Sequence, residues 1–169
     1  MLLTIIIGET GSGKSTLAKQ IFKSVDHGIV YDVQNEYECQ TYQQNKKKFK
    51  LSPTDTDTKK LMLYFENCKG YSFFVEECTA LFRGTIDKKF TNLILSKRHT
   101  KNNFFLIFHS LHRVPMQLME FCDVLVMFKT NDVEDNIKKK YPKYFDSFKK
   151  LQTLPKFSKI IHKQSNLLK

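Results

Sequence analysis

The chain has 169 residues, of which 41% are hydrophobic and 15 are phenylalanines, so it can build the core of one compact domain. Its longest apolar runs, such as "LLTIII" and "VLVMF", are far shorter than the roughly 20 residues that cross a bilayer, and no signal peptide opens the chain, so we expect no transmembrane segment and no secretion. The net charge of +11 allows two interpretations, attraction to a polyanion such as DNA or a lysine-rich coding bias.

Short apolar runs alternate with longer amphipathic segments along the chain, and this alternation is typical of an α/β sheet. The apolar runs predict strands at residues 2–7, 28–33, 71–77, 104–110 and 123–129. Amphipathic spacing predicts helices between them, at about 14–25, 56–68 and 86–97. From about residue 131 the chain is basic and is predicted to be helical, with breaks near Pro142 and Pro155. We therefore expect one domain over residues 1–169, with a core of about 1–132 and a basic, helical extension of about 133–169.

The segment "GETGSGKS" at residues 8–15 matches the phosphate-binding pattern G-x-x-x-x-G-K-[ST] between a predicted strand and a predicted helix. Its glycines let backbone N–H groups point at phosphates, and the helix N-terminus adds positive partial charge. We expect Lys14 to reach the β- and γ-phosphates and Ser15 to offer its hydroxyl to Mg²⁺. The predicted cofactors are therefore ATP and Mg²⁺, and the predicted nucleotide-binding residues are Gly8, Glu9, Thr10, Gly11, Ser12, Gly13, Lys14, Ser15 and Thr16.

With this loop, the predicted fold class is α/β, a P-loop NTPase three-layer sandwich. Its central sheet is expected to be mostly parallel, with five or more strands and helices on both faces.

Two adjacent glutamates end the apolar run "YSFFVEE". Because ligands of open α/β sheets bind at the carboxyl ends of the strands, we expect Glu76 to bind Mg²⁺ and Glu77 to act as the general base on the attacking water. The alternative is that one or both glutamates cap the next helix, since acidic residues favour helix N-termini.

Arginine is scarce, since the 28 basic residues include only Arg83, Arg98 and Arg113. In ring-shaped ATPases an arginine from a neighbouring subunit stabilises charge on the γ-phosphate, and the planar guanidinium suits this task better than an ammonium. We predict that Arg98, between the third helix and the fourth strand, is this arginine finger, with Arg83 and Arg113 as alternatives. His109, at the end of the fourth strand, is the candidate sensor of the γ-phosphate, or else a strand-end histidine with ordinary partners.

Four segments together resemble the FtsK/HerA superfamily of DNA-pumping ATPases, and within it the small genome-packaging ATPases of tailless, membrane-containing viruses and phages. They are "GETGSGKST", "VYDVQNEYE" with Asp32, Glu36 and Tyr37, "FFVEEC", and "KRHTKNNFFLIFHS", within roughly residues 2–132. The chain departs from the family's usual pattern at two positions, where Glu76 stands in place of aspartate and His109 in place of the frequent glutamine.

The resemblance implies a motor that hydrolyses ATP to move DNA, here the viral genome, into a preformed capsid. It also implies a homo-oligomeric ring, hexamer or pentamer, with catalysis at subunit interfaces and DNA in the pore. Further implied partners are capsid vertex or viral membrane proteins, and the implied location is the virion or the host cytoplasm.

Three alternatives remain open. One is a small nucleotide or metabolite kinase, in which Asp32 would bind the acceptor hydroxyl, although such enzymes carry arginines in a lid and this chain has none after Arg113. A second is an assembly ATPase of the filamentous-phage type, which needs a membrane anchor. A third is a structural protein of a virus vertex that binds ATP without cleaving it.

Overall fold

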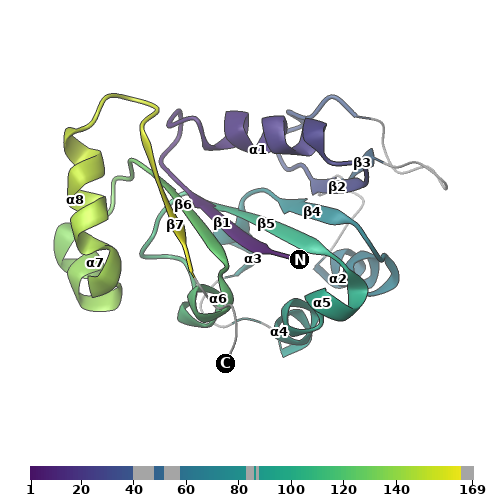
Figure 1. The fold of residues 1–169 in the computed structure, drawn as a ribbon. Helices are drawn as coiled ribbons and strands as arrows, with labels where there is room; N and C mark the ends of the chain where they lie inside the picture. The colour runs from purple at the N-terminus through teal and green to yellow at the C-terminus, as the bar shows by residue number, and fades with distance from the viewer. Residues whose placement is uncertain (40–47, 52–57, 83–85, 87, 165–169) are drawn as a thin grey trace.

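The computed structural model describes residues 1–39, 48–51, 58–82, 86 and 88–164. Seven strands form one sheet in the order β3-β2-β4-β5-β1-β6-β7 (Figure 1). Their bounds are β1 Leu3–Ile7, β2 Gly28–Tyr31, β3 Lys48–Leu51, β4 Ser72–Val75, β5 Asn103–Phe108, β6 Val124–Phe128 and β7 Lys159–Lys163. Every neighbouring pair is parallel except β6 with β7, which is antiparallel. The prediction of an α/β fold with a mostly parallel sheet of five or more strands is confirmed.

Helices cover both faces of the sheet (Figure 1). Helix α1 (Lys14–Ser24) lies on one face, where Ala18 and Phe22 pack on Ile6, Val30 and Phe74. The helices that contribute to the larger core on the other face are α2 Thr58–Asn67, α3 Cys78–Leu81, α4 Lys88–Leu95, α6 Met116–Phe121, α7 Glu134–Lys140 and α8 Phe145–Thr153. Two short helices, α5 Lys97–Thr100 and the 3₁₀ turn η1 Pro142–Tyr144, complete the set.

The central strands are buried on both faces, which is why they read as continuous apolar runs. All five residues of β1 are buried, and alternate ones enter different cores: Ile5 and Ile7 belong to the larger cluster and Ile6 to the cluster under α1. This alternation follows from the two-residue repeat of a strand. The single apolar run "LTIII" therefore holds the two helical layers together.

Two parts of the chain differ from the predicted elements. The predicted helix at 86–97 ends earlier, because α4 stops at Leu95 and a separate short helix, α5, begins at Lys97. The segment after residue 131 is helical only as far as Thr153, and residues 159–163 form β7, so the expectation of a wholly helical extension is wrong. The physical reason is that β7 completes the sheet by pairing along the whole of β6, from Val124 to Phe128.

Within the part of the chain that the structure describes, no helix combines the length and the apolar character needed to cross a membrane.

Candidate nucleotide-binding site

The strand order brings the predicted site residues together at one edge of the sheet. Strand β5 lies between β1 and β4, and all three run in the same direction. The residue that follows β5, His109, therefore lies between the phosphate-binding loop after β1 and the two glutamates after β4. A cleft of about 440 Å³ opens there, and its walls include Lys14, Glu76, Glu77 and His109. We call this side the carboxyl edge of the sheet.

The phosphate-binding loop, residues 8–15, takes a conformation that only its glycines allow. Gly11 and Gly13 have φ angles of 75° and 99°, in the left-handed region that side chains disfavour. A Cβ on Gly8 would lie 2.8 Å from Cβ of Phe128 and would collide with Ser12. The Gly8 N–H donates to the Phe108 carbonyl at 3.2 Å, which attaches the loop to the end of β5.

Two polar groups of this loop are buried without a hydrogen-bond partner among the described residues. The Lys14 side chain lines the cleft, is 5% exposed, and has no acceptor within the described chain. Burial lowers the pKa of Lys14, and the carboxylates of Glu76, Glu77 and Glu36 oppose that shift. The Ser12 hydroxyl is likewise buried without a partner. A buried cation with no acceptor is costly unless an anion meets it, so the loop is suited to a phosphate group.

Glu76 is the more buried of the two glutamates, with 8% exposure. Its Oε1 accepts a hydrogen bond of 2.6 Å from the Tyr37 hydroxyl. Burial raises the pKa of Glu76, while the Tyr37 hydrogen bond and the charge of Lys14 act in the opposite direction. Burial and the neighbouring carboxylate also raise the pKa of Tyr37, so this hydroxyl keeps its proton and remains a donor.

Glu77 has different partners from Glu76. It adopts a left-handed conformation with φ of 56°, and its Oε1 lies 2.6 Å from His109 Nε2 and accepts a hydrogen bond of 3.2 Å from Gln34 Nε2. A carboxylate can only accept, so Nε2 of His109 carries the hydrogen in this contact. Glu77 does occupy the N-cap position of α3, but its side chain makes no capping hydrogen bond. The geometry therefore favours the site role of this side chain over the capping alternative.

The loop after β2 supports both glutamates. Its first residue, Asp32, is 4% exposed and accepts hydrogen bonds from the backbone N–H groups of Glu36 and Tyr37, at 3.0 and 2.9 Å. These bonds fix the loop that delivers Tyr37 to Glu76 and Gln34 to Glu77. Sequence reasoning gave Tyr37 no chemical role and did not identify Gln34. The signal for Tyr37 was its place in "DVQNEY", but nothing in the sequence marked Gln34.

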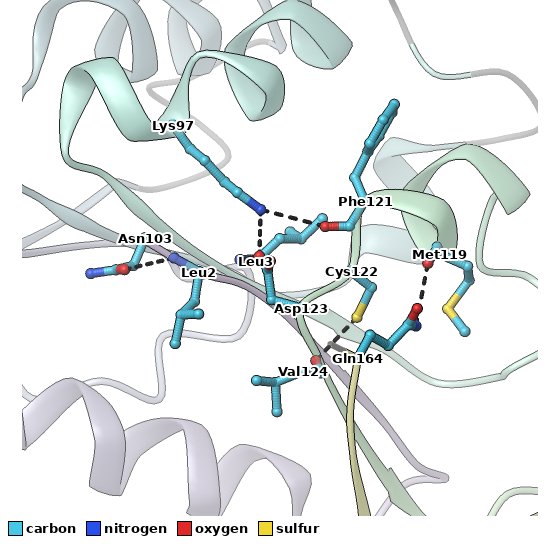
Figure 2. Close-up of polar contacts among 10 residues, drawn as sticks. All are labelled: Leu2, Leu3, Lys97, Asn103, Met119, Phe121, Cys122, Asp123, Val124 and Gln164. Carbon is cyan, nitrogen blue, oxygen red and sulfur yellow. Dashed lines mark hydrogen bonds and ion pairs between the residues drawn. The ribbon is translucent and has the colours of Figure 1, made fainter. Parts of the chain in front are cut away.

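Arg98 lies at the opposite, amino edge of the sheet. It is an exposed residue of α5, which precedes β5, and it makes no hydrogen bond or ion pair with any described residue. The neighbouring Lys97 is buried, and its ammonium bonds to the Asp123 carboxylate and to the Phe121 carbonyl (Figure 2). The same carboxylate accepts the Leu3 N–H at 2.7 Å. The start of β1, the turn before β6 and α5 are thereby fastened together next to Arg98.

The other two arginines fall elsewhere. Arg113 is exposed at the carboxyl edge, in a second cleft whose walls also include Glu77, His109 and Asp132. Arg83 lies outside the described residues. Of the finger candidates that are described, only Arg98 lies at the edge away from its own phosphate-binding loop.

Comparison with known proteins places the chain in a family. The family model described as "Helicase HerA, central domain" matches residues 4–168. The chain belongs to the HerA central-domain family. The resemblance to the FtsK/HerA superfamily is thus confirmed, and this HerA-family chain also carries the match through the segment after residue 132. No curated protein sequence matches it significantly.

Solved structures share the fold of this HerA-family chain at low sequence identity. The DNA-packaging ATPase B204 from Sulfolobus turreted icosahedral virus superposes with a TM-score of 0.77 at 15% identity, covering 96% of this chain and 92% of that one. The genome-packaging NTPase B204 from Sulfolobus turreted icosahedral virus 2, in complex with ATP-gammaS, gives 0.75 at 18% identity, with coverages of 96% and 91%. The expected P-loop NTPase fold is therefore confirmed.

Proposed function

We propose that this chain is a Mg²⁺-dependent ATPase that uses hydrolysis to translocate DNA, and that it packages a viral genome into a preformed capsid. The observation that carries the hydrolytic part is the contact of Glu77 with His109 beside the buried, unpaired Lys14. Membership of the HerA family and the likeness to B204, a DNA-packaging ATPase, support the assignment to DNA. The net charge of +11 fits a polyanionic partner.

The residues of the cleft divide the work of hydrolysis between them. Backbone N–H groups of residues 8–16 hold the phosphates, and Lys14 neutralises charge at the β- and γ-phosphates. Glu77 accepts the proton of the attacking water, with one carboxylate oxygen held by His109 and Gln34. Because His109 touches the base and also lies next to the loop, it can sense whether a γ-phosphate is present.

The donor set of the cleft fits Mg²⁺. Ser15 offers a hydroxyl and Glu76 a buried carboxylate, both on the wall of the cleft. No group of three or more histidine, cysteine, aspartate or glutamate side chains that could hold a metal occurs among the described residues. Mg²⁺ commonly takes one or two protein ligands together with substrate phosphates and water, so two residues suffice. When bound, the ion supplies positive charge to the phosphates of the nucleotide.

We further propose that the protein works as a ring, hexamer or pentamer, in which Arg98 completes the site of the neighbouring subunit. The residues of β5 separate α5 from the carboxyl edge by about 20 Å at the usual rise per residue, so Arg98 cannot serve its own site. The anchored position of Lys97 holds Arg98 at a fixed place on the surface. We place the motor in the virion or the host cytoplasm, with a capsid vertex or viral membrane protein as its docking partner.

The cleft weighs against the kinase alternative. There Asp32 would have to accept a hydrogen bond from a substrate hydroxyl, but both of its oxygens already accept backbone N–H groups of its own loop. A vertex protein that only binds ATP, and an assembly ATPase that acts on protein, are separated from the DNA motor by experiment.

The test is the steady-state ATPase rate with and without double-stranded DNA, with Lys14→Ala as the inactive control. We expect turnover that DNA stimulates several-fold, and DNA binding that weakens steeply as salt rises because phosphate contacts release counterions. ATP binding without turnover would identify the structural alternative. Turnover that ignores DNA, together with binding that ignores salt, would leave an ATPase whose substrate is not DNA.

A further inference from the structure

The loop between α8 and β7 reaches the phosphate-binding loop from the side opposite to the catalytic groups. Because β7 runs antiparallel to β6, with Lys159 paired to Phe128, the residues just before β7 lie at the carboxyl edge. In Figure 1 the yellow segment before β7 passes beside the purple loop between β1 and α1. Lys156 and Phe157 from this segment line the same cleft as Lys14 and Glu77.

Phe157 packs on the phosphate-binding loop itself. A Cβ placed on Gly13 would lie 3.2 Å from Cδ1 of Phe157, so the missing side chain of this glycine lets the aromatic ring come close. The ring is nevertheless 62% exposed, and the Phe157 backbone has a φ of 71°. A bulky residue in the left-handed region is strained, and such strain concentrates at functional sites. Core packing explains neither the exposure of this ring nor its conformation.

Strand order fixes which end of a bound nucleotide would meet Phe157. The groups that act on the γ-phosphate, Glu77 and His109, follow β4 and β5, on one side of β1. Phe157 precedes β7, on the other side of β1. A nucleotide whose γ-phosphate faces Glu77 must therefore extend its nucleoside end toward the side of Phe157.

We propose that Phe157 is the platform on which the base of the nucleotide stacks. The proposal rests on the proposed function, because it takes the phosphate-binding loop to hold ATP. An exposed aromatic face offers a base favourable stacking, and this contact tolerates different bases because each of them has a π face. The Lys156 ammonium lies 5.3 Å from the ring centroid. Lys156 is itself exposed, so a base can take its place against the ring.

The platform makes a prediction that a purely structural role does not make. Tripolyphosphate has the phosphates of ATP but no base, so only ATP should lose affinity when the ring is removed. Calorimetric titration of Phe157→Ala should give about tenfold weaker binding of ATP, the scale of one lost base–aromatic stack, with tripolyphosphate affinity unchanged. Phe157→Tyr keeps an aromatic face and should bind ATP as the wild type does.

Ile161→Ala is the matched control, because Ile161 is a half-exposed apolar residue of the adjoining strand β7, outside the cleft. It should leave both affinities unchanged. An equal loss of ATP and tripolyphosphate affinity in Phe157→Ala, or no loss of either, would overturn the platform while leaving the proposed ATPase in place. A wild-type chain that binds neither ligand would overturn the proposed function and the platform together.

Discussion

Two lysines at opposite edges of the sheet are buried to a similar extent but have different surroundings. Lys14, at the carboxyl edge, is 5% exposed, and Lys97, at the amino edge, is 8% exposed. Lys97 has the Asp123 carboxylate and the Phe121 carbonyl as partners, whereas Lys14 has no acceptor among the described residues and lines a cleft. An unpaired buried charge costs far more than a paired one. The comparison indicates that the amino edge is complete within the chain, while the carboxyl edge is built for an anionic ligand.

The two edges are complementary in a ring. The carboxyl edge holds the phosphate-binding loop and the carboxylates, and the amino edge presents Arg98 on an anchored helix. A subunit that offers its amino edge to the carboxyl edge of the next would supply the guanidinium that the cleft lacks. The predictions below test this division of labour between the edges.

The largest effect is expected from the amino edge. Arg98→Ala should lower the ATPase rate of the assembled protein by about 10³-fold or more, the range of arginine fingers in other nucleotide hydrolases, without weakening ATP binding. Arg113→Ala, which removes the arginine of the carboxyl edge, is the matched control and should have a much smaller effect on turnover. Equal losses in the two variants would contradict the assignment of the finger to the amino edge.

A mixture of two inactive variants tests whether Arg98 acts across an interface. Arg98→Ala subunits keep Glu77, and Glu77→Gln subunits keep Arg98, so mixed rings contain some complete interfaces. Random mixing of equal amounts makes about a quarter of the interfaces complete. Activity should therefore return on mixing, and a mixture as inactive as its components would rule out action in trans.

At the carboxyl edge, Glu77→Gln should lower the ATPase rate by about 10²- to 10⁴-fold, the usual contribution of a positioned general base. Glutamine keeps the size of the side chain and can still contact His109, so ATP affinity should be retained. Gln34→Ala removes only the second partner of Glu77 and serves as the milder comparison. Wild-type turnover by Glu77→Gln would refute its role as the base.

The elements of this sheet differ in how far the sequence predicts them. Strands β1, β2, β4, β5 and β6 are apolar on both faces, so their runs stand out. β3, "KFKL", and β7, "KIIHK", alternate lysine or histidine with apolar residues, and they lie at the two ends of the sheet. Edge strands carry charges because these discourage pairing with other chains, and the same charges hide such strands from a search for apolar runs.

The site was predictable where chemistry is local in sequence and not where it depends on folding. The phosphate-binding loop is a contiguous motif, and strand ends placed Glu77 near His109. By contrast, Tyr37 meets Glu76 across 39 positions of sequence, and Lys97 meets Asp123 across 26, so only the assembled sheet reveals these pairs. Phe157 escaped notice because β7, the strand that carries it to the cleft, was itself not predicted.

The buried pair of the amino edge is expected to dominate local stability. Asp123→Ala would leave the Lys97 ammonium buried without its carboxylate and should lower the free energy of unfolding by about 3 kcal/mol. Lys19→Ala, which removes an exposed pair with Glu36 at 2.7 Å, should cost less than about 1 kcal/mol. Urea titration of both variants measures the difference, and equal losses would mean that the amino edge is not held by this pair.

The smallest effect is expected from the hydroxyl that orients Glu76. Tyr37→Phe removes the hydrogen bond of 2.6 Å to Oε1 but keeps the ring that packs against Phe22. Because partners that orient a metal ligand typically change affinity by 10-fold or somewhat more, we expect the Mg²⁺ concentration for half-maximal ATPase activity to rise about tenfold. Tyr144→Phe removes a buried hydroxyl bonded to Gln164 far from the cleft and should leave that concentration unchanged. An unchanged Mg²⁺ requirement in Tyr37→Phe would show that Glu76 needs no orienting partner, or that the ion is held by other groups of the carboxyl edge.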